Sequence, residues 1–208
     1  MSIDSPVVSG PTSGRGAGET RRRILEAASA LFYAQGIRAT SADRIIEQVG
    51  ITKVTFYRHF RTKSDLVVAY LEGQAALERS AVERAVEGAD ALDALRAIAG
   101  DIGAVSCSPG FRGCPFINAA AETPDPDDPV RVVVDRHRRW TRDVFARLAA
   151  EAGSADADAT AGQLMMLRDG AMVAGYLGDP DEVAETLRTA AVAAVAASRP
   201  AAGRPAAG

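Results

Sequence analysis

Apolar residues recur at helical spacing along most of the chain. Over residues 19–35, Ile24, Ala28 and Leu31 fall on one face at intervals of three and four residues. Similar stripes predict longer helices over 63–86, 90–105, 129–152, 156–177 and 180–198, with short helices between residues 40 and 60 and over 116–122. No segment alternates apolar and polar residues as a half-buried strand does. The pattern therefore predicts an all-α fold of about nine helices.

Turn and capping residues mark the ends of the first four helices. Gly36 and Gly50 stand where a residue in the left-handed conformation commonly ends a helix, and Gly50 also makes the turn between the second and third helices. A threonine followed three residues later by an acidic residue predicts an N-terminal cap. The predicted capping residues are Thr40 with Asp43, Thr52, and Thr62 with Asp65.

Composition divides the chain into four segments. Residues 1–18 are rich in Gly, Ser and Pro and residues 199–208 in Ala, Gly and Pro, so both are predicted to be disordered. Residues 19–64 form a predicted three-helix unit, and residues 65–198 form a larger helical body. Pro180 is suited to the first turn of the last helix, where its missing N–H does no harm.

Charge is distributed unevenly along the chain. The formal net charge is −3, but residues 19–64 carry nine Lys or Arg against four Asp or Glu. Residues 65–208 carry 14 Lys or Arg against 22 Asp or Glu. A basic N-terminal quarter on an acidic body predicts a polyanionic partner for the first part only.

Several classes of protein do not fit the composition. No apolar run approaches the ~20 residues of a membrane-spanning helix, and no basic start followed by an apolar stretch resembles a secretory signal. Two cysteines do not make a disulfide framework. No phosphate-binding loop, metal motif or nucleophile–base pair is visible, so we expect neither an enzyme nor a cofactor or metal. A cytoplasmic protein with no membrane partner is the expectation.

Residues 37–66 concentrate the groups that are suited to DNA. Two short helices joined by a tight glycine turn have the layout of a helix-turn-helix unit, whose second helix presents its N-terminal residues to base edges. Lysine reads guanine there, and threonine bonds an edge or touches a thymine methyl. The predicted contacts are Thr52, Lys53 and Thr55 to bases, Tyr57, His59 and Lys63 to phosphates, and Ser41 from the preceding helix.

Other roles remain open for some of these residues. His59 could instead be a core or capping histidine, and Val54 could reach a thymine methyl or pack into the core. Arg15 and the run Arg21–Arg23 could touch DNA from the N-terminal arm, or belong to a solvated helix start. The aromatic residues Phe32, Phe56 and Phe60 are predicted to form the core of the three-helix unit.

The combined pattern of residues 21–66 resembles the DNA-binding domain of the TetR/AcrR family. The resemblance is carried by Phe32 and Gly36, Val49-Gly50-Ile51-Thr52, and Thr55-Phe56-Tyr57-x-His59-Phe60-x-x-Lys63-x-x-Leu66. It implies an all-helical homodimer of nine-helix subunits, with Lys53 and Thr55 as base readers and Tyr57, His59 and Lys63 as backbone clamps. Ile46 and Val49 stand where family members usually have smaller residues, which implies altered packing but the same docking.

The body is predicted to hold a small-molecule site. An apolar cavity with a few polar anchors is the common form of such a site. The candidate lining residues are Phe111, Phe116, Asn118, His137, Trp140, Met165, Asp169 and Met172. The alternative is that the aromatic and methionine side chains are ordinary core and that His137 is a satisfied histidine.

Small residues in the last two predicted helices allow close approach of helix backbones. Gly162, Gly170, Gly175 and the alanines of residues 190–197 suit a four-helix dimer interface formed by helices 8 and 9 of each subunit. Intrachain packing and high alanine usage are the alternatives. The family resemblance favours the interface.

The sequence thus predicts a ligand-responsive transcriptional regulator that binds double-stranded operator DNA. A repressor released from a palindromic operator by a small apolar effector is the leading hypothesis. The alternative is a thiol-redox or metal-sensing regulator that uses Cys107 and Cys114, although two cysteines and His137 are few ligands for a metal. The arginine run within residues 136–142 is interpreted as a solvated helix face.

Overall fold

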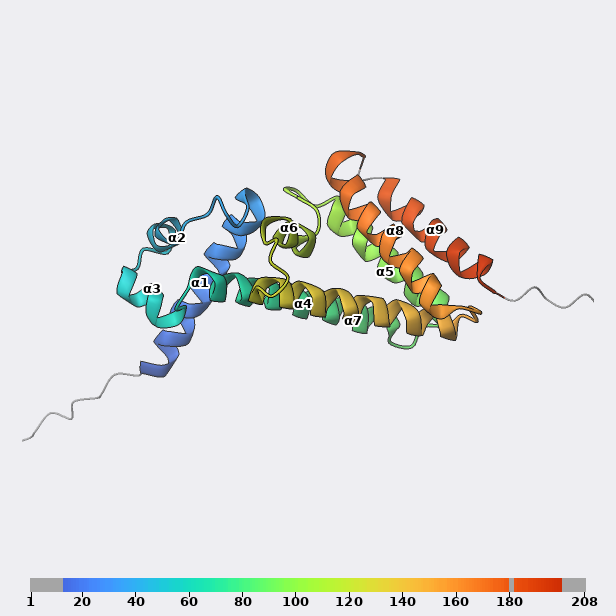
Figure 1. Cartoon of the computed structure of the whole chain (residues 1–208), viewed down its shortest axis with the longest axis horizontal. Coiled ribbons are helices and arrows are strands. Elements are labelled where there is room, and N and C mark those ends of the chain that lie inside the picture. The colour runs from blue at the N-terminus through green and yellow to red at the C-terminus, as the bar shows by residue number, and fades with distance from the viewer. Residues whose placement is uncertain (1–12, 180–181, 200–208) are drawn as a thin grey trace, which may run out of the picture.

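The computed structural model describes residues 13–179 and 182–199, and within them every regular element is a helix, which confirms the all-α prediction. Figure 1 shows these helices along the chain. Their bounds are α1 Ser13–Gln35, α2 Ala42–Val49, α3 Lys53–His59, α4 Lys63–Val86, α5 Ala91–Ser106, α6 Pro115–Glu122, α7 Pro129–Glu151, α8 Ala157–Leu177 and α9 Val183–Ala197.

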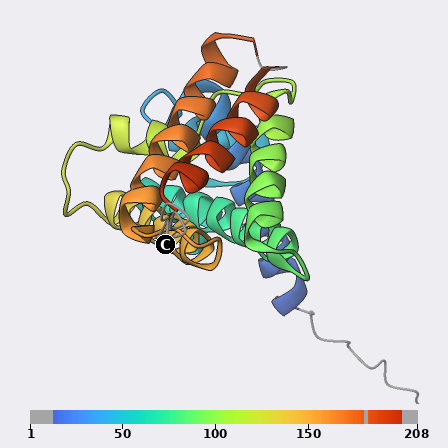
Figure 2. The ribbon, with the colours of Figure 1, turned by 90° about the vertical axis from the view of Figure 1, so that its right-hand side faces the viewer.

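The molecule is elongated, with α1, α2 and α3 at one end and the pair α8 and α9 at the other (Figure 1). The long helix α4 runs from the three-helix end into the body, where α7 packs along it. The short helix α6 lies between the two ends. Seen from the body end, α8 and α9 lie side by side on the outside of the bundle (Figure 2). The two terminal segments, residues 1–12 and 200–208, lie outside the described part of the chain.

Local sequence signals account for most helix ends. Thr62 accepts a hydrogen bond from the Asp65 N–H, and the Asp65 carboxylate accepts one from the Thr62 N–H, both at 3.0 Å, so the predicted capping pair is confirmed. Gly50 ends α2 in the left-handed conformation at φ 69°. The predicted cap at Thr40 is wrong, because Ser41 caps α2 and Thr40 is buried.

The starts of the first and last helices differ from the prediction. Helix α1 begins at Ser13 rather than residue 19, so residues 13–18 belong to a helix and not to an arm. Two predictions concern residues outside the described part of the chain. They are the disorder of residues 1–12 and 200–208 and the place of Pro180 in the first turn of the last helix. The last helix begins at Val183. Within the described residues, no helix is both long and apolar enough to span a membrane.

One buried cluster joins the three-helix end to the body. It contains Phe32, Ile45 and Phe56 from the first three helices, and it continues through Leu66 and Tyr70 of α4. Further members come from α6, α7 and α8: Phe116, Ala119, Val130, Val133, Val134 and Met172. Since the apolar core crosses the predicted boundary between residues 64 and 65, α4 belongs structurally to both parts. Packed side chains therefore connect the three-helix end to the body without a break.

Candidate functional site

The exposed side of α3 is the first candidate site. Phe56 is fully buried and anchors the helix, so the residues on its opposite side face outward. Thr52 caps α3 by accepting from the Thr55 N–H at 3.2 Å, and the two hydroxyls lie 2.9 Å apart. The exposed Lys53 ammonium lies 3.3 Å from Asp43, a surface pair of small energetic value. These groups remain free to meet another molecule.

Val54 is 72% exposed, which contradicts the interpretation that it packs into the core. The reason lies in the short helix, because only one side of its seven residues can face α1 and α2, and Phe56 occupies that side. Val54 and the exposed Arg58 thus join the outward surface of α3. The sequence carried a signal for the exposure of Val54. This residue lies in the first turn of α3, on a different side of the helix from Phe56 and Phe60.

The three predicted phosphate contacts follow the exposed surface toward α4. Tyr57 is exposed and rests edge-on against Phe56, with ring centroids 5.2 Å apart. His59 is partly buried at the C-terminal end of α3. Lys63 begins α4, and burial lowers the pKa of its ammonium below the ordinary value. Ser41, the N-cap of α2, is exposed, and its hydroxyl accepts a hydrogen bond from the Arg44 N–H.

The basic run at the start of α1 is largely occupied by contacts within the protein. Arg23 donates to the carbonyl of Val49 at 2.6 Å and so ties α1 to the end of α2. The Arg21 guanidinium lies 4.8 Å from the centroid of the Phe60 ring. Arg22 is paired with acidic residues of its own helix. These contacts support a structural role for the run.

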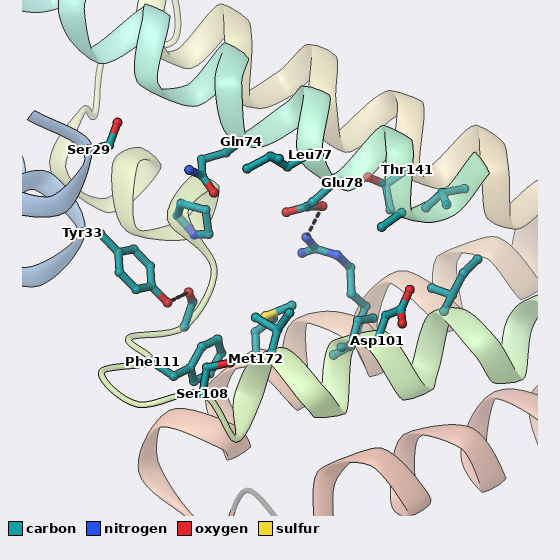
Figure 3. A pocket seen from close by; sticks show the side chains of 18 of the residues that line it. Ser29, Tyr33, Gln74, Leu77, Glu78, Asp101, Ser108, Phe111, Thr141 and Met172 are labelled. Atoms are coloured by element: carbon teal, nitrogen blue, oxygen red, sulfur yellow. Dashed lines mark hydrogen bonds and ion pairs between the residues drawn. The ribbon is translucent and has the colours of Figure 1, made fainter. Parts of the chain in front are cut away.

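The second candidate site is a cavity of about 590 Å³ in the body. Helices α1, α4, α5, α7 and α8 and the loop before α6 surround it. Figure 3 shows Gln74, Leu77 and Glu78 entering it from α4, opposite Met172 and Asp101. Three of the residues predicted from the sequence line it: Phe111, Trp140 and Met172.

The other five predicted residues do not line this cavity. Phe116 is fully buried behind it, and its ring stacks on His137 at a centroid distance of 3.7 Å. Met165 lies in the second buried cluster, between α5, α7, α8 and α9. Asn118 is exposed and donates to the carbonyl of Arg112 at 2.8 Å. Asp169 binds Arg138 through two hydrogen bonds, at 3.1 and 2.7 Å. Helical periodicity alone did not distinguish these positions from those that line the cavity.

The main charged groups of the cavity wall are Glu78 and Arg168, which the sequence analysis missed. The Glu78 Oε2 atom lies 2.9 Å from His137 Nε2 and 3.2 Å from Arg168 Nη2. Burial alone would raise the pKa of the Glu78 carboxyl, but the hydrogen bond with His137 and the charge of Arg168 hold it below the ordinary value. His137 is therefore buried and bonded to Glu78 through Nε2, whereas its buried Nδ1 atom has no partner among the described residues, so the alternative of a satisfied histidine holds for one ring nitrogen only.

A signal for Glu78 did exist in the sequence. The apolar stripe of α4 passes through Leu66 and Tyr70, and the next positions on that side of the helix are Gln74 and Glu78. Polar residues at such positions of a helix are costly to bury without partners. Their presence on the inner side of α4 indicates a cavity with polar groups in its wall rather than a closed core.

The two cysteines are thiols in different surroundings. Cys107 is exposed, whereas Cys114 is buried with its sulfur 3.6 Å from Arg168 Nη1. Arg112 is the one cation close to the cysteines in the sequence, but the fold also brings Arg168 to Cys114 from 54 residues away. Among the described residues no group of three or more His, Cys, Asp or Glu could hold a metal ion. This arrangement does not favour the redox- or metal-sensing alternative.

Two sets of hydrogen bonds tie the cavity loop and α6 to the three-helix end. The Tyr33 hydroxyl donates to the carbonyl of Gly113 at 3.0 Å and accepts from the Arg112 N–H at 2.9 Å. Glu122, the last residue of α6, accepts from the N–H groups of Ile37 and Arg38. Tyr33 also lines the cavity. The wall of the cavity therefore includes part of α1.

Two family models match the chain. Residues 24–70 match the model described as bacterial regulatory proteins, tetR family. Residues 91–191 match the model described as tetracyclin repressor-like, C-terminal domain. Between them they cover the three-helix end and most of the body.

Individual relatives agree with these matches. The crystal structure of SCO4454, a TetR-family transcriptional regulator from Streptomyces coelicolor, is 41% identical, with a TM-score of 0.84 over 88% of this chain and 97% of that one. The probable HTH-type transcriptional regulator ArpR of Pseudomonas putida is 39% identical over 77 residues, which are 37% of this chain and only 36% of ArpR. The uncharacterized HTH-type transcriptional regulator YxaF of Bacillus subtilis is 27% identical over 68% of this chain and 76% of its own length.

Proposed function

Since this chain belongs to the TetR family of bacterial transcriptional regulators, we propose that a small molecule in the body cavity controls its binding to operator DNA. The regulator is of the DNA-binding repressor type, and the effector would release it from the operator. One observation carries the proposal of control. Tyr33 of α1 lines the cavity and bonds the cavity loop, so an occupant of the cavity contacts the DNA-binding end directly.

The DNA contacts follow from the exposed surface of α3. Lys53 and Thr55 read base edges in the major groove, and Thr52 both caps the helix and supports Thr55 through their paired hydroxyls. Tyr57, His59 and Lys63 contact phosphates and fix the position of α3 along the groove. Val54 is exposed beside them and is suited to the methyl group of a thymine.

Release would act through the residues that connect the two sites. An occupant that moves Tyr33 or the loop before α6 also moves α1, because the hydrogen bonds to Gly113 and Arg112 join them. Glu122 carries the same motion to the turn between α1 and α2. An effector shifts the equilibrium only as far as it binds the DNA-incompetent conformation more tightly.

A homodimer formed through α8 and α9 would place two α3 helices on one operator. On α8, Met166 is 70% exposed and Leu177 is 75% exposed, with Val173 between them on the same face. Gly170, on that face too, has no heavy atom near the position of an added Cβ. A row of exposed apolar side chains with a glycine among them is suited to a second helix. Two subunits would then read half-sites about 34–36 Å apart, or multiples of that spacing.

The test combines DNA selection with a fluorescence assay. Selection from random duplex DNA should enrich an inverted repeat, and enrichment of no sequence would contradict the proposed operator binding. Trp140 is the only tryptophan and lines the cavity, so its emission reports occupancy. A compound that changes this emission should also lower affinity for the selected DNA. If compounds fill the cavity and leave DNA affinity unchanged, control by an effector is refuted.

A further inference from the structure

Three polar residues of α4 face the cavity in one row. Tyr70, Gln74 and Glu78 are spaced by four residues and all line the cavity wall. Four residues are slightly more than one helical turn, so their side chains stand one above the other. The row extends about 12 Å along the helix axis at 1.5 Å per residue. Figure 3 shows two of the three, Gln74 and Glu78, pointing from α4 into the same space.

Each member of the row has hydrogen-bonding capacity that the described part of the protein does not use. Tyr70 is only 4% exposed, and its hydroxyl has no partner among the described residues. The side-chain amide of Gln74 likewise has none there. Both contacts of Glu78 go to Oε2, which leaves Oε1 available. These groups border the cavity and are open to it, so a ligand that fills the cavity along α4 would meet all three.

The charges around the cavity disfavour an anionic ligand. Arg168 is the cation of the wall, but its Nη2 atom donates to Glu78, and its Nη1 atom donates to Asp169 at 3.2 Å and to Cys114. Asp101 adds a second carboxylate to the wall. Arg79 lies over the Trp140 ring at 5.6 Å and does not line the cavity. An incoming carboxylate would meet two acids and a guanidinium already paired with Glu78 and Asp169, whereas a cation would meet Oε1 of Glu78.

The rest of the wall is suited to an apolar body. Helices α5 and α7 border the cavity with the side chains of Ile98, Ile102, Trp140, Val144 and Phe145. Such side chains bind hydrocarbon and aromatic groups by removing them from water. The row on α4 thus provides polar groups in a wall that is otherwise mostly apolar. A matching ligand is polar along one edge or at its ends.

We propose that the effector is an elongated, mostly apolar amine that lies along α4. Its ammonium group binds Oε1 of Glu78, and a second polar group reaches the hydroxyl of Tyr70. This proposal rests on the proposed effector function of the cavity and narrows it to a chemical class. Its closing experiment needs no DNA, so that its failure can be told apart from failure of DNA control.

The first measurement compares three probes with one skeleton on the unmodified full chain. The probes are 4-phenylbutylamine, 4-phenylbutan-1-ol and 4-phenylbutanoate, titrated at neutral pH with Trp140 emission as readout. The amine should bind at least about tenfold more tightly than the carboxylate, with the alcohol between them, because hydrogen bonds between charged partners are stronger than neutral ones. Tighter binding of the carboxylate, or no response to any of the three, would overturn the proposal. Binding of the carboxylate would still leave DNA control open to the operator assay.

Glu78→Gln then tests where the ammonium binds. This substitution should weaken the amine at least about tenfold and change the alcohol less than about threefold. Glu83→Gln is the matched control, because Glu83 is an exposed residue of the same helix and does not line the cavity. Equal loss of amine binding in both variants would refute a specific role of Glu78. The probe order on the unmodified chain stands as a test even if the Glu78 variant folds poorly.

Tyr70→Phe tests the other end of the row. The substitution removes only a hydroxyl that has no partner among the described residues, so the fold should be retained. A probe with an added para-hydroxyl, 4-(4-hydroxyphenyl)butylamine, should bind the unmodified chain more tightly than 4-phenylbutylamine does. That gain should disappear in Tyr70→Phe. A gain that persists in the variant would contradict the placement of the ligand along α4.

Discussion

The carboxylate of Glu122 accepts a hydrogen bond of 2.9 Å from the backbone N–H of Ile37, across 85 residues of sequence. Its second oxygen accepts from the neighbouring N–H of Arg38 at 2.7 Å. Gly36 precedes this turn at φ +94°, and a Cβ there would lie 3.1 Å from the same carboxylate. One side chain at the end of α6 thus holds the backbone between α1 and α2, which sets the position of the recognition unit relative to the body.

Glu122→Ala should therefore weaken both the fold and operator binding. Loss of two charge-assisted acceptors is expected to lower the free energy of unfolding by about 1–2 kcal/mol in this partly exposed position. Urea titration and binding to the selected operator measure the two effects. Glu83→Ala, which removes an exposed carboxylate from α4, is the control and should change neither. Equal behaviour of the two variants would contradict a role for Glu122 in holding the turn.

Replacement of the two lysines should separate sequence reading from backbone binding. Lys53→Ala should relax the preference at one base pair, at a cost of about 1–3 kcal/mol on the preferred operator. Lys63→Ala should weaken all DNA nearly equally and reduce the slope of log affinity against log salt by about one. Arg96→Ala removes one cation from an exposed site on α5 and serves as control. The assignments fail if both lysine variants bind operator and random DNA like the unmodified protein.

Two glycine-to-alanine substitutions within helices should have opposite effects on stability. A Cβ at Gly103 would lie 2.2 Å from the Cβ of Ala184, so Gly103→Ala forces α5 and α9 apart and should cost about 1–3 kcal/mol. At Gly73 nothing lies within 4 Å of an added Cβ. Gly73→Ala should raise the free energy of unfolding by about 0.5–1 kcal/mol, because alanine is the better helix former. Denaturant midpoints of the two variants give the comparison, and equal midpoints would refute it.

The Glu78 carboxylate should contribute stability that depends on pH. Its pKa is lower in the folded protein than in the unfolded chain, so the contribution is present above the unfolded value of about 4.3. It is lost as pH falls through the folded pKa. The difference in unfolding free energy between the unmodified chain and Glu78→Gln should thus be largest near neutral pH and shrink in acid. A difference that grows on acidification would show that the sign of the pKa change is wrong.

A charge placed on the exposed face of α8 should disrupt the proposed dimer. Met166→Glu introduces a carboxylate into the apolar row that would meet the second subunit, and its desolvation opposes association. Light scattering after size exclusion should then give the mass of one chain. Val132→Glu is the control, because Val132 is an exposed apolar residue of α7, 49% accessible. Dissociation in the control as well, or in neither variant, would contradict the α8 interface.

The sequence predicted the helices well because the signals for a helix are local. The helical period of apolar residues, the Thr62–Asp65 capping box and the left-handed Gly50 all depend on residues within one or two turns. The same locality explains the two boundary errors. Ser41 and Thr40 are both able to cap, and only the burial of Thr40 against α1 decides for Ser41. The start of α1 at Ser13 has no strong signal, since Gly and Ser are poor helix formers.

The cavity shows the limit of local signals. The helical period identified inward positions on α7 and α8, but it could not tell which of them would border empty space and which would be packed behind it. His137 and Phe116 stack on each other in the core, and Trp140, three residues after His137, lines the cavity. That distinction depends on how far the neighbouring helices lie from one another.

By itself, the sequence determined that this protein is all-helical, that it belongs to a family of DNA-binding regulators, and which short helix carries the candidate base-reading residues. These properties follow from residues close together in the chain. Only the tertiary structure decided that Arg168 meets Glu78 from 90 residues away and is thereby occupied. The same is true of Glu122 at the α1–α2 turn. Such contacts depend on helix packing between distant segments, and that packing determines both the charge of the cavity and its connection to the DNA-binding end.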